Sequence, residues 1–386
     1  MNDANIVPIK VAVVVGTRPE AIKMAPVILA LAKDHEFVPI LIATGQHGEM
    51  LSQALDLFNL TPDHNLQVMQ PGQSLAELTA KIVAGVSSLL DELKPDVVLV
   101  HGDTTTAFAS SLAAFYLGVP VGHVEAGLRT RNILGPFPEE FNRQAIARLA
   151  TWNFAPTSNA SANLVAELVA PESIHVTGNT IVDALNMVIQ QLNNDGELGG
   201  QVKRELLDIL KLDYEARPLV LVTAHRRENL GGGIESICEA VADLAELFPS
   251  VNFVFPVHLN PVVRELAEKH LSGKENVTLT RPLNYLEFLT LLSRCSLAIS
   301  DSGGVQEEGV SLNKRILVTR EETERAEGVK SGHLTLVGAN RKVIVEEASS
   351  VLTAFERSEP FSGLENPYGD GSAAARILGV LAAHGK

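Results

Sequence analysis

The sequence predicts an α/β fold of two Rossmann-like, doubly wound parallel-sheet domains facing a cleft. Short β-branched runs alternate with helical patterns from end to end, and apolar strands that alternate with helices indicate parallel sheets covered on both faces. Twelve such runs exceed what one sheet of ordinary size holds. A polar stretch at Asn193–Gly200 interrupts the pattern near the middle, and 386 residues suffice for two or three domains.

Each expected strand is a short run rich in Val, Ile and Leu. In the first half these runs are Lys10–Val15, Val38–Ala43, Val97–His101, Val119–Val124, Trp152–Ala155 and Ile174–Val176. In the second half they are Leu219–Thr223, Asn252–Pro256, Val277–Leu279, Leu297–Ser300, Ile316–Thr319 and Leu334–Val337. Amphipathic stretches between them predict helices, among them Ala21–Lys33, Leu75–Leu93 and Gly232–Leu247. We place the domain boundary in the turn after Val176, which gives domains 1–178 and 179–366, followed by a helical tail.

The composition restricts the classes of partner. Lys and Arg total 31 and Asp and Glu total 46, so the formal charge is −15. This argues against non-specific binding to nucleic acid or anionic membranes, because both need a basic face. The two cysteines, Cys238 and Cys295, form no metal or disulfide pattern, and no signal peptide or long apolar run is visible. We therefore expect a cytoplasmic protein that binds no metal.

The first strand leads into a turn, GTRPEAIKMAP, that is suited to an anion. Gly16 permits a tight turn and Pro19 fits a helix start, which places backbone N–H groups at the carboxyl edge of a sheet. Arg18 and Lys23 beside this turn suit a pyrophosphate. The alternative is a surface ion pair between Arg18 and Glu20. Because the turn is not GxGxxG, no dinucleotide cofactor is indicated.

Three carboxylates follow the later strands of the first half. Asp103 comes directly after an apolar strand, Glu125 follows the next strand, and Glu139 opens a helix, with Arg143 four residues on as an expected salt-bridge partner. The alternative role of Asp103 is a helix N-cap before Thr104. Carboxylates that converge on one cleft raise one another's pKa, which makes them usable acids and bases near neutral pH.

The second half supplies two further candidate sites. His225 and Arg226 leave a strand end with Arg227, either as a cationic cluster or as an ion-pair network with Glu228. Later, an apolar strand ends in a serine and two glycines that open a helix, and glycines there let a phosphate approach free N–H groups. The residues of this second site are Ser302, Gly303, Gly304, Glu308 and Arg325. Glu308 is expected to bind the ribose. The alternative role of Arg325 is an ion pair with Glu324 or Glu327.

With these segments in order, the sequence resembles bacterial UDP-N-acetylglucosamine 2-epimerases of the non-hydrolysing type. The resemblance covers nearly the whole chain and rests on GTRPEAIKMAP, HGDTTT, GHVEAGLRT, PFPEEFNR, VTAHRREN, PVHLNP, SDSGGVQEE, ETERAE and NPYGDG. It implies the glycosyltransferase-B architecture, with the C-terminal helix (about 367–386) returning to the first domain, and a homodimer. It also implies interconversion of UDP-GlcNAc and UDP-ManNAc for surface polysaccharides, by anti elimination of UDP to 2-acetamidoglucal and re-addition, without a cofactor.

The resemblance also implies roles for individual residues. Four acid/base and leaving-group residues are expected at the sugar and the pyrophosphate: Asp103, Glu125, Glu139 and His225. Substrate-binding residues are expected to be Arg18, Lys23, Phe288, Ser302, Gly303, Gly304, Glu308 and Arg325. Phe288 matches a position near the uracil, although a core aromatic is the alternative. A second UDP-GlcNAc, bound as an activator, is expected to contact Gln46, His47, Gln73, Arg226 and His258.

Three other functions fit parts of this pattern. A hydrolysing 2-epimerase releases free ManNAc and UDP instead of recapturing the glycal. A glycosyltransferase can share the same architecture, since fold alone does not fix function. A catalytically silent nucleotide-sugar sensor binds without turnover. The three carboxylates of the first half favour epimerisation over glycosyl transfer, and the presence of all four catalytic candidates argues against a silent sensor.

Overall fold

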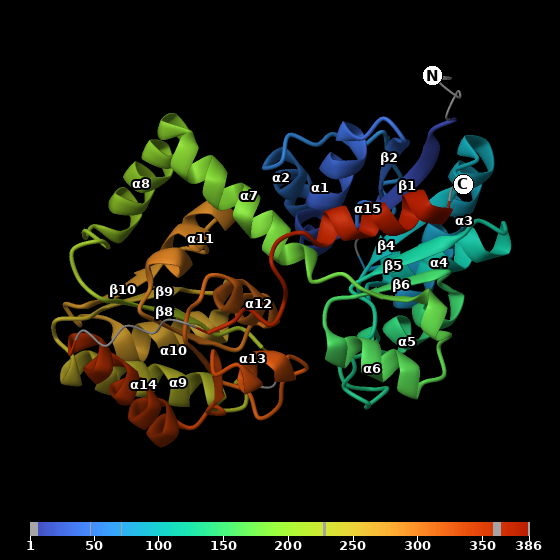
Figure 1. Cartoon of the computed structure of the whole chain (residues 1–386). Coiled ribbons are helices and arrows are strands. Elements are labelled where there is room, and N and C mark those ends of the chain that lie inside the picture. The colour runs from blue at the N-terminus through green and yellow to red at the C-terminus, as the bar shows by residue number, and fades with distance from the viewer. Residues whose placement is uncertain (1–6, 47, 71, 227–228, 358–363, 385–386) are drawn as a thin grey trace. The chain divides into compact units, whose positions relative to one another are not determined.

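The computed structural model describes residues 7–46, 48–70, 72–226, 229–357 and 364–384. The chain divides into two compact units, Met1–Met187 with Tyr368–Lys386, and Val188–Pro367. The division falls inside helix α7 (Thr180–Asn194), a little beyond the boundary that we place from the sequence. Figure 1 shows the elements of both units.

The first unit is built on a sheet of seven parallel strands in the order β3-β2-β1-β4-β5-β6-β7. Its strands are β1 (Ile9–Val15), β2 (Phe37–Ala43), β3 (His64–Asn65), β4 (Val97–His101), β5 (Val121–Val124), β6 (Trp152–Ala155) and β7 (Ile174–Val176). The chain order reverses between β1 and β4, so the segments that follow these two strands lie at the same carboxyl edge. In open α/β sheets, this switch point is where ligands bind.

Helices cover both faces of this sheet. They are α1 (Arg18–Lys33), α2 (Gly48–Asp56), α3 (Leu75–Leu93), α4 (Thr105–Tyr116), α5 (Glu139–Leu149), α6 (Ser158–Ala166), α7 and α15 (Ala373–His384), with a 3₁₀ turn at Pro171–Ser173. The main core joins α3, α4 and α5 to the sheet. The C-terminal helix α15 packs beside α1 (Figure 1). Its start is fixed by Asp183, which accepts the N–H groups of Ala373 and Ala374 at 3.2 and 2.9 Å.

The second unit repeats the arrangement with six parallel strands in the order β10-β9-β8-β11-β12-β13. These are β8 (Leu219–Thr223), β9 (Asn252–Pro256), β10 (Val277–Thr280), β11 (Leu297–Ser300), β12 (Ile316–Val318) and β13 (Leu334–Leu336). The helices are α8 (Gly196–Leu210), α9 (Gly233–Leu247), α10 (Pro261–Leu271), α11 (Tyr285–Arg294), α12 (Gly303–Ser311), α13 (Ala326–Lys330) and α14 (Arg341–Glu356). Helices α9, α10 and α14 form one core with the sheet. Here the switch point lies between β8 and β11.

The twelve strands predicted from the sequence are confirmed, with ends that shift by a residue or two. Strand β3 was not predicted because His64 and Asn65 make no apolar run. The polar stretch Asn193–Gly200 is helical rather than a linker. There α7 ends at Asn194, and Asp195 caps α8 by accepting the N–H groups of Glu197 and Leu198, both at 3.0 Å.

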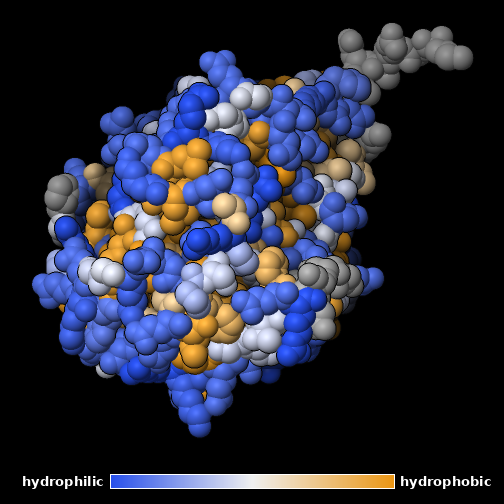
Figure 2. Space-filling model, turned by 90° about the vertical axis from the view of Figure 1, so that its left-hand side faces the viewer, coloured by the Kyte–Doolittle hydropathy of each residue, from blue (hydrophilic) through white to orange (hydrophobic). Residues whose placement is uncertain are grey.

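In the part of the chain that the structure describes, no helix is both long and apolar enough to cross a membrane. Figure 2 shows one face of the molecule, which is largely hydrophilic with small groups of hydrophobic side chains between the polar ones. Such groups are ordinary, since apolar atoms make up a large part of most protein surfaces.

Candidate active site

The turn between β1 and α1 is built around a buried carboxylate, Glu20. This residue is 1% exposed and accepts hydrogen bonds from the N–H groups of Gly16 (3.0 Å) and Thr17 (2.7 Å). It also accepts one from the Thr104 hydroxyl (2.6 Å), which follows β4. Glu20 thus ties together the two loops of the switch point. Its carboxylate is buried while Arg18 is exposed, so the alternative of a surface ion pair between them is wrong.

The close packing of this turn explains its glycine. A Cβ at position 16 would lie 2.1 Å from the Thr106 hydroxyl oxygen and 2.5 Å from that of Thr44. These two hydroxyls hydrogen-bond each other at 2.9 Å. Helix α1 begins at Arg18, so Pro19 is its second residue rather than its first. Since Glu20 occupies two of the N–H groups at this turn, an anion here must rely more on side-chain cations than on backbone amides.

Replacing Glu20 by Gln is expected to change how stability depends on pH. Burial raises the pKa of Glu20 to about 7, although four hydrogen bonds, from Thr104, Thr17 and Gly16, oppose the rise. The folded state therefore binds this proton more tightly than the unfolded state, so the contribution of Glu20 to stability is complete below pH 4.5 and is lost as pH rises through 7. The difference in the free energy of unfolding, E20Q minus wild type, should therefore rise between about pH 5 and 8, by a few kcal/mol at most.

Urea unfolding at several pH values measures this difference. Glu77 provides a matched control, because it closes a second capping box, with Ser74, but is exposed and has a lowered pKa. The difference between E77Q and the wild type should stay flat above about pH 5, since a lowered carboxyl pKa acts only at more acidic pH. A flat profile for E20Q as well would contradict the account of Glu20.

Glu125, at the end of β5, is held in a strained and crowded position. Its φ of 65° lies in the left-handed region, which costs a non-glycine residue on the order of 1–3 kcal/mol. Its carboxylate forms an ion pair with Lys23 of α1, and both side chains are 9% exposed. The Asn179 amide donates to the same oxygen at 3.1 Å, and His101 Nε2 lies 3.8 Å from it. Strain of this kind clusters at functional sites.

Asp103, after β4, pairs with Arg143 of α5. It is not the cap of α4, because Thr104 occupies that position and accepts the Ala107 N–H at 2.9 Å. Burial is the main cause that raises the pKa of Asp103, Arg143 lowers it, and the charges of Glu125 and Glu139 raise it further. Glu125 and Glu139 therefore both lie close enough to Asp103 to influence its carboxylate.

Glu139 opens α5, as predicted, but Arg143 is not its partner. The Arg143 guanidinium instead joins Asp103 to Glu140, whose Oε2 lies 3.3 Å from Nη1. Oxygen Oε2 of Glu139 is buried and accepts no hydrogen bond within the described part of the chain. A buried carboxylate oxygen without a donor is costly, which favours a role toward a ligand.

Two buried histidines, His101 and His123, lie next to the segments that carry Glu125 and Asp103. Desolvation lowers the pKa of His101 to about 4 and that of His123 to about 3, so both are neutral at pH 7. His123 Nε2 lies 2.7 Å from the carbonyl oxygen of Gly102 and must donate to it. This bond fixes the loop that carries Asp103.

In the second unit, His225 and Asp301 lie on either side of the switch point, after β8 and β11. Asp301 is fully buried, and its Oδ1 lies 3.1 Å from His225 Nδ1. Its Oδ2 accepts the N–H groups of His225 (3.0 Å) and Arg226 (2.9 Å) and the side-chain amide of Asn229 (3.0 Å). Burial alone would raise the pKa of Asp301, but these hydrogen bonds hold it below its usual value. Arg227 and Glu228 lie outside the described residues.

The residues predicted to bind phosphate lie at the start of α12. Ser302 is the N-cap residue, yet its hydroxyl makes no capping hydrogen bond. A Cβ at Gly303 would lie 3.0 Å from the Arg325 guanidinium, so this cation sits directly over the glycine. Arg325 pairs with Glu324, one of the two partners that the sequence offers, and with Glu307 at 2.8 Å.

The other predicted nucleotide contacts lie on α11 and α12. Glu308 follows on α12 and is partly exposed. Gly304 is open, since a Cβ there would meet only the Ser302 hydroxyl, at 3.9 Å. Phe288 is partly exposed on α11.

The five residues expected around an activator fall in different parts of the chain. Gln46 accepts the Thr106 hydroxyl at 2.9 Å, and Gln73 Oε1 accepts the Gln70 N–H at 2.9 Å. A cavity of about 370 Å³ lies beside this segment, lined by residues of β2, α2 and β3. In the second unit, the ring of His258 stacks on that of His225 with centroids 5.8 Å apart. Arg226 follows His225, and His47 lies outside the described residues.

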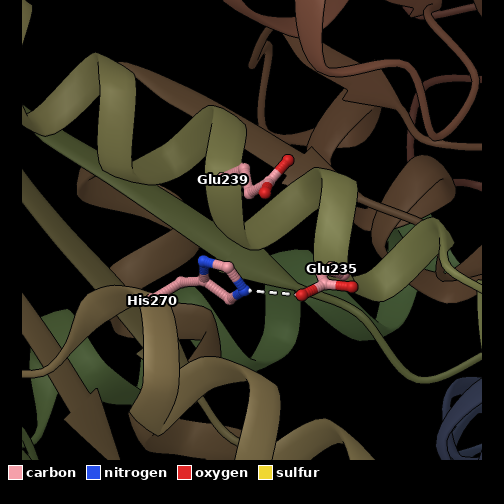
Figure 3. A group of neighbouring side chains, drawn as sticks. All are labelled: Glu235, Glu239 and His270. Carbon is pink, nitrogen blue, oxygen red and sulfur yellow. Dashed lines mark hydrogen bonds and ion pairs between the residues drawn. The ribbon is translucent and has the colours of Figure 1, made fainter.

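One group of possible metal ligands occurs elsewhere in the second unit. Glu235 and Glu239 of α9 lie near His270 of α10 (Figure 3), and His270 Nε2 is 2.9 Å from Glu235 Oε1. Both carboxylates already have cationic partners, since Lys269 lies 2.7 Å from Glu235 and Arg341 lies 3.2 Å from Glu239. The group is explained as an ion-pair network that joins these helices.

Known proteins are similar to this chain in sequence and in fold. A sequence model of the family described as UDP-N-acetylglucosamine 2-epimerase matches residues 29–382. The chain belongs to this epimerase family. It is 48% identical to the UDP-N-acetylglucosamine 2-epimerases of Yersinia pestis, over 97% of this chain and 99% of that protein, and of Escherichia coli K12, over 96% and 98%. A crystal structure of UDP-GlcNAc 2-epimerase from Neisseria meningitidis bound to UDP-GlcNAc matches with a TM-score of 0.89 and 44% identity, covering 97% of this chain and all of that one.

Membership of the epimerase family confirms the resemblance seen in the sequence, and the chain is therefore an isomerase of the 2-epimerase type. The predicted fold class is confirmed as well, since both units are parallel-sheet α/β domains and the solved relatives share them.

Sequence reasoning missed two residues of the epimerase that the structure places at the switch points. Glu20 completes the pattern Thr17-x-x-Glu20, a capping-box signal that was available in the sequence, but its burial was not. Asp301 stands beside Ser302 in SDSGG, and nothing in its neighbourhood indicates that it meets His225. Both residues connect segments that are far apart in the chain.

Proposed function

We propose that this enzyme is a non-hydrolysing epimerase, which interconverts UDP-GlcNAc and UDP-ManNAc by anti elimination of UDP to 2-acetamidoglucal and re-addition. Family membership supports the substrate class, and the crystallised relative from Neisseria meningitidis binds UDP-GlcNAc. The single observation that carries the proposal is the group of three carboxylates in the first unit, Asp103, Glu125 and Glu139, of which two influence the pKa of the third.

The chemistry requires such a group. No carbonyl is attached to C2, so loss of the C2 proton must be coupled to departure of the diphosphate from C1. Positioned acids and bases contribute about 10²–10⁴-fold to such a reaction. Stabilisation of the leaving diphosphate by cations and N–H donors must supply a large further share. The first unit offers the carboxylates together with Arg18 and Lys23, and the second offers further cations and N–H donors.

In this proposal, the carboxylates act at the sugar ring. Glu125 is ion-paired with Lys23 and lies close to neutral His101. Asp103 keeps a raised pKa and so holds a proton more readily than an ordinary Asp. Glu139 has a buried oxygen that accepts no hydrogen bond among the described residues, which suits contact with substrate. Arg18 and Lys23 supply positive charge on the same edge.

The second unit is proposed to hold the nucleotide. His225 assists the departure of the diphosphate. Ser302, Gly303, Gly304 and Arg325 bind its phosphates at the start of α12, Glu308 binds the ribose hydroxyls, and Phe288 lies near the uracil. The hydroxyl of Ser302, which makes no capping bond, and the guanidinium above Gly303 support this assignment.

Incubation with UDP-GlcNAc followed by ³¹P and ¹H NMR tests the proposal. The expected result is UDP-ManNAc, with the sugar still attached to the diphosphate. Accumulation of free ManNAc and UDP would assign a hydrolysing enzyme instead. Binding without turnover would assign a nucleotide-sugar sensor.

Further features of the proposal rest on the resemblance. A second UDP-GlcNAc is proposed to act as an activator through Gln46, His47, Gln73, Arg226 and His258; full reverse rate with UDP-ManNAc alone, without a lag, would contradict it. We also propose a homodimer that supplies UDP-ManNAc for bacterial surface polysaccharides. A cytoplasmic location agrees with the two cysteines, Cys238 and Cys295, which are buried and free.

A further inference from the structure

The ring of His225 is constrained on three sides. The backbone N–H groups of His225 and Arg226 both donate to the buried carboxylate of Asp301, which fixes the backbone that carries the ring. Its Nδ1 lies 3.1 Å from Asp301 Oδ1. Its face stacks on the His258 ring with an interplanar angle of 23°. None of these three contacts involves Nε2 of the imidazole.

While it is ionised, the Asp301 carboxylate accepts hydrogen bonds but cannot donate one. Its surroundings favour that state, because its Oδ2 accepts three N–H donors, from His225, Arg226 and Asn229. An ionised carboxylate beside Nδ1 requires a proton on that nitrogen. The neutral ring is then the Nδ1–H tautomer, whose Nε2 is an acceptor, and the protonated ring carries its second proton on Nε2.

We propose that Asp301 is a positioning residue that fixes the tautomer and orientation of His225, so that Nε2 exchanges a proton with the diphosphate. This inference rests on the proposed function for the identity of the diphosphate. In the elimination, the Nε2 proton passes to an oxygen of the departing UDP as its C1–O bond breaks. In the re-addition, the same proton returns to Nε2 as the C1–O bond forms.

His258 fits the same arrangement. Its Nδ1 accepts the N–H of Asn260 at 3.1 Å, so its ring proton is on Nε2 and the ring is neutral in this state. A neutral ring stacked on His225 restrains its rotation without adding a positive charge beside it.

The wild-type protein provides the first test. ¹⁵N-labelled histidine and two-bond ¹H–¹⁵N correlation spectra distinguish the two tautomers, and H225Q identifies the signals of His225. The expected result for the neutral ring is a proton on Nδ1. A proton on Nε2 in the neutral ring would overturn the proposal. This readout does not depend on turnover, so it stands apart from any failure of the proposed function.

The second test is D301N, which keeps the size of the side chain. Its carbonyl oxygen can still accept the three N–H donors, while its amide must donate toward Nδ1 and so reverses the tautomer. We expect His225 to switch to the Nε2–H form and kcat to fall by about 10²-fold or more, with KM little changed. The matched control is N229A, which removes a donor to Asp301 but leaves the His225 contact, and should keep the tautomer. An unchanged tautomer in D301N, or an equal loss of kcat in both variants, would overturn the proposal.

Discussion

Replacing Glu125 by Gln is expected to lower kcat by about 10²–10⁴-fold, because a positioned acid or base contributes that much. Gln keeps the size of the side chain and can still accept a hydrogen bond from Asn179, but it cannot take up a proton from the substrate. The affinity for UDP, measured by calorimetry, should change far less than kcat, since most of the proposed phosphate ligands belong to the second unit. Steady-state kinetics with UDP-GlcNAc measure the loss.

A matched control separates chemistry from structure. Glu167 also forms a partly buried ion pair in the first unit, with Arg129 at 2.7 Å, but at a distance along the chain from the carboxylate group. E167Q should therefore keep its kcat. Full activity in E125Q, or an equal loss in E167Q, would remove Glu125 from the acid/base group.

Replacing Lys23 by Met is expected to destabilise the fold by about 3–5 kcal/mol, because it leaves the buried Glu125 carboxylate without its cation. Met keeps most of the apolar stem, so little packing is lost. The free energy of unfolding, from urea titration, measures the effect.

The double variant K23M/E125Q is the control for this loss. It removes both charges, so no uncompensated ion stays buried, and it should be more stable than K23M alone. Strict additivity of the two single changes would contradict a direct coupling between Lys23 and Glu125.

The sequence predicts well what local patterns determine. Apolar runs mark the strand ends, and parallel strands place their carboxyl ends on one edge, so Asp103, Glu125, His225 and Ser302 could each be placed at such an edge. The helix starts were also visible from turn residues such as Gly16 and Ser302. These signals need only a few neighbouring residues.

The sequence does not predict which side chains meet. Lys23 and Glu125 are 102 residues apart, Asp103 and Arg143 are 40 apart, and His225 and Asp301 are 76 apart. The nearest cation along the chain gave the wrong partner for Glu139, because Arg143 pairs with Asp103 and Glu140 instead. Burial, which decides the pKa of Glu20 and the charge state of His101, depends on the packing of whole helices and is not encoded in a short motif.

Incubation with UDP-GlcNAc in deuterated water tests the central chemistry most directly. If carboxylates of the first unit remove and return the C2 proton, the UDP-ManNAc formed must carry deuterium at C2, and the recovered UDP-GlcNAc should gain it too as equilibrium is approached. Epimerised product that retains its original hydrogen at C2 would contradict this account of the enzyme.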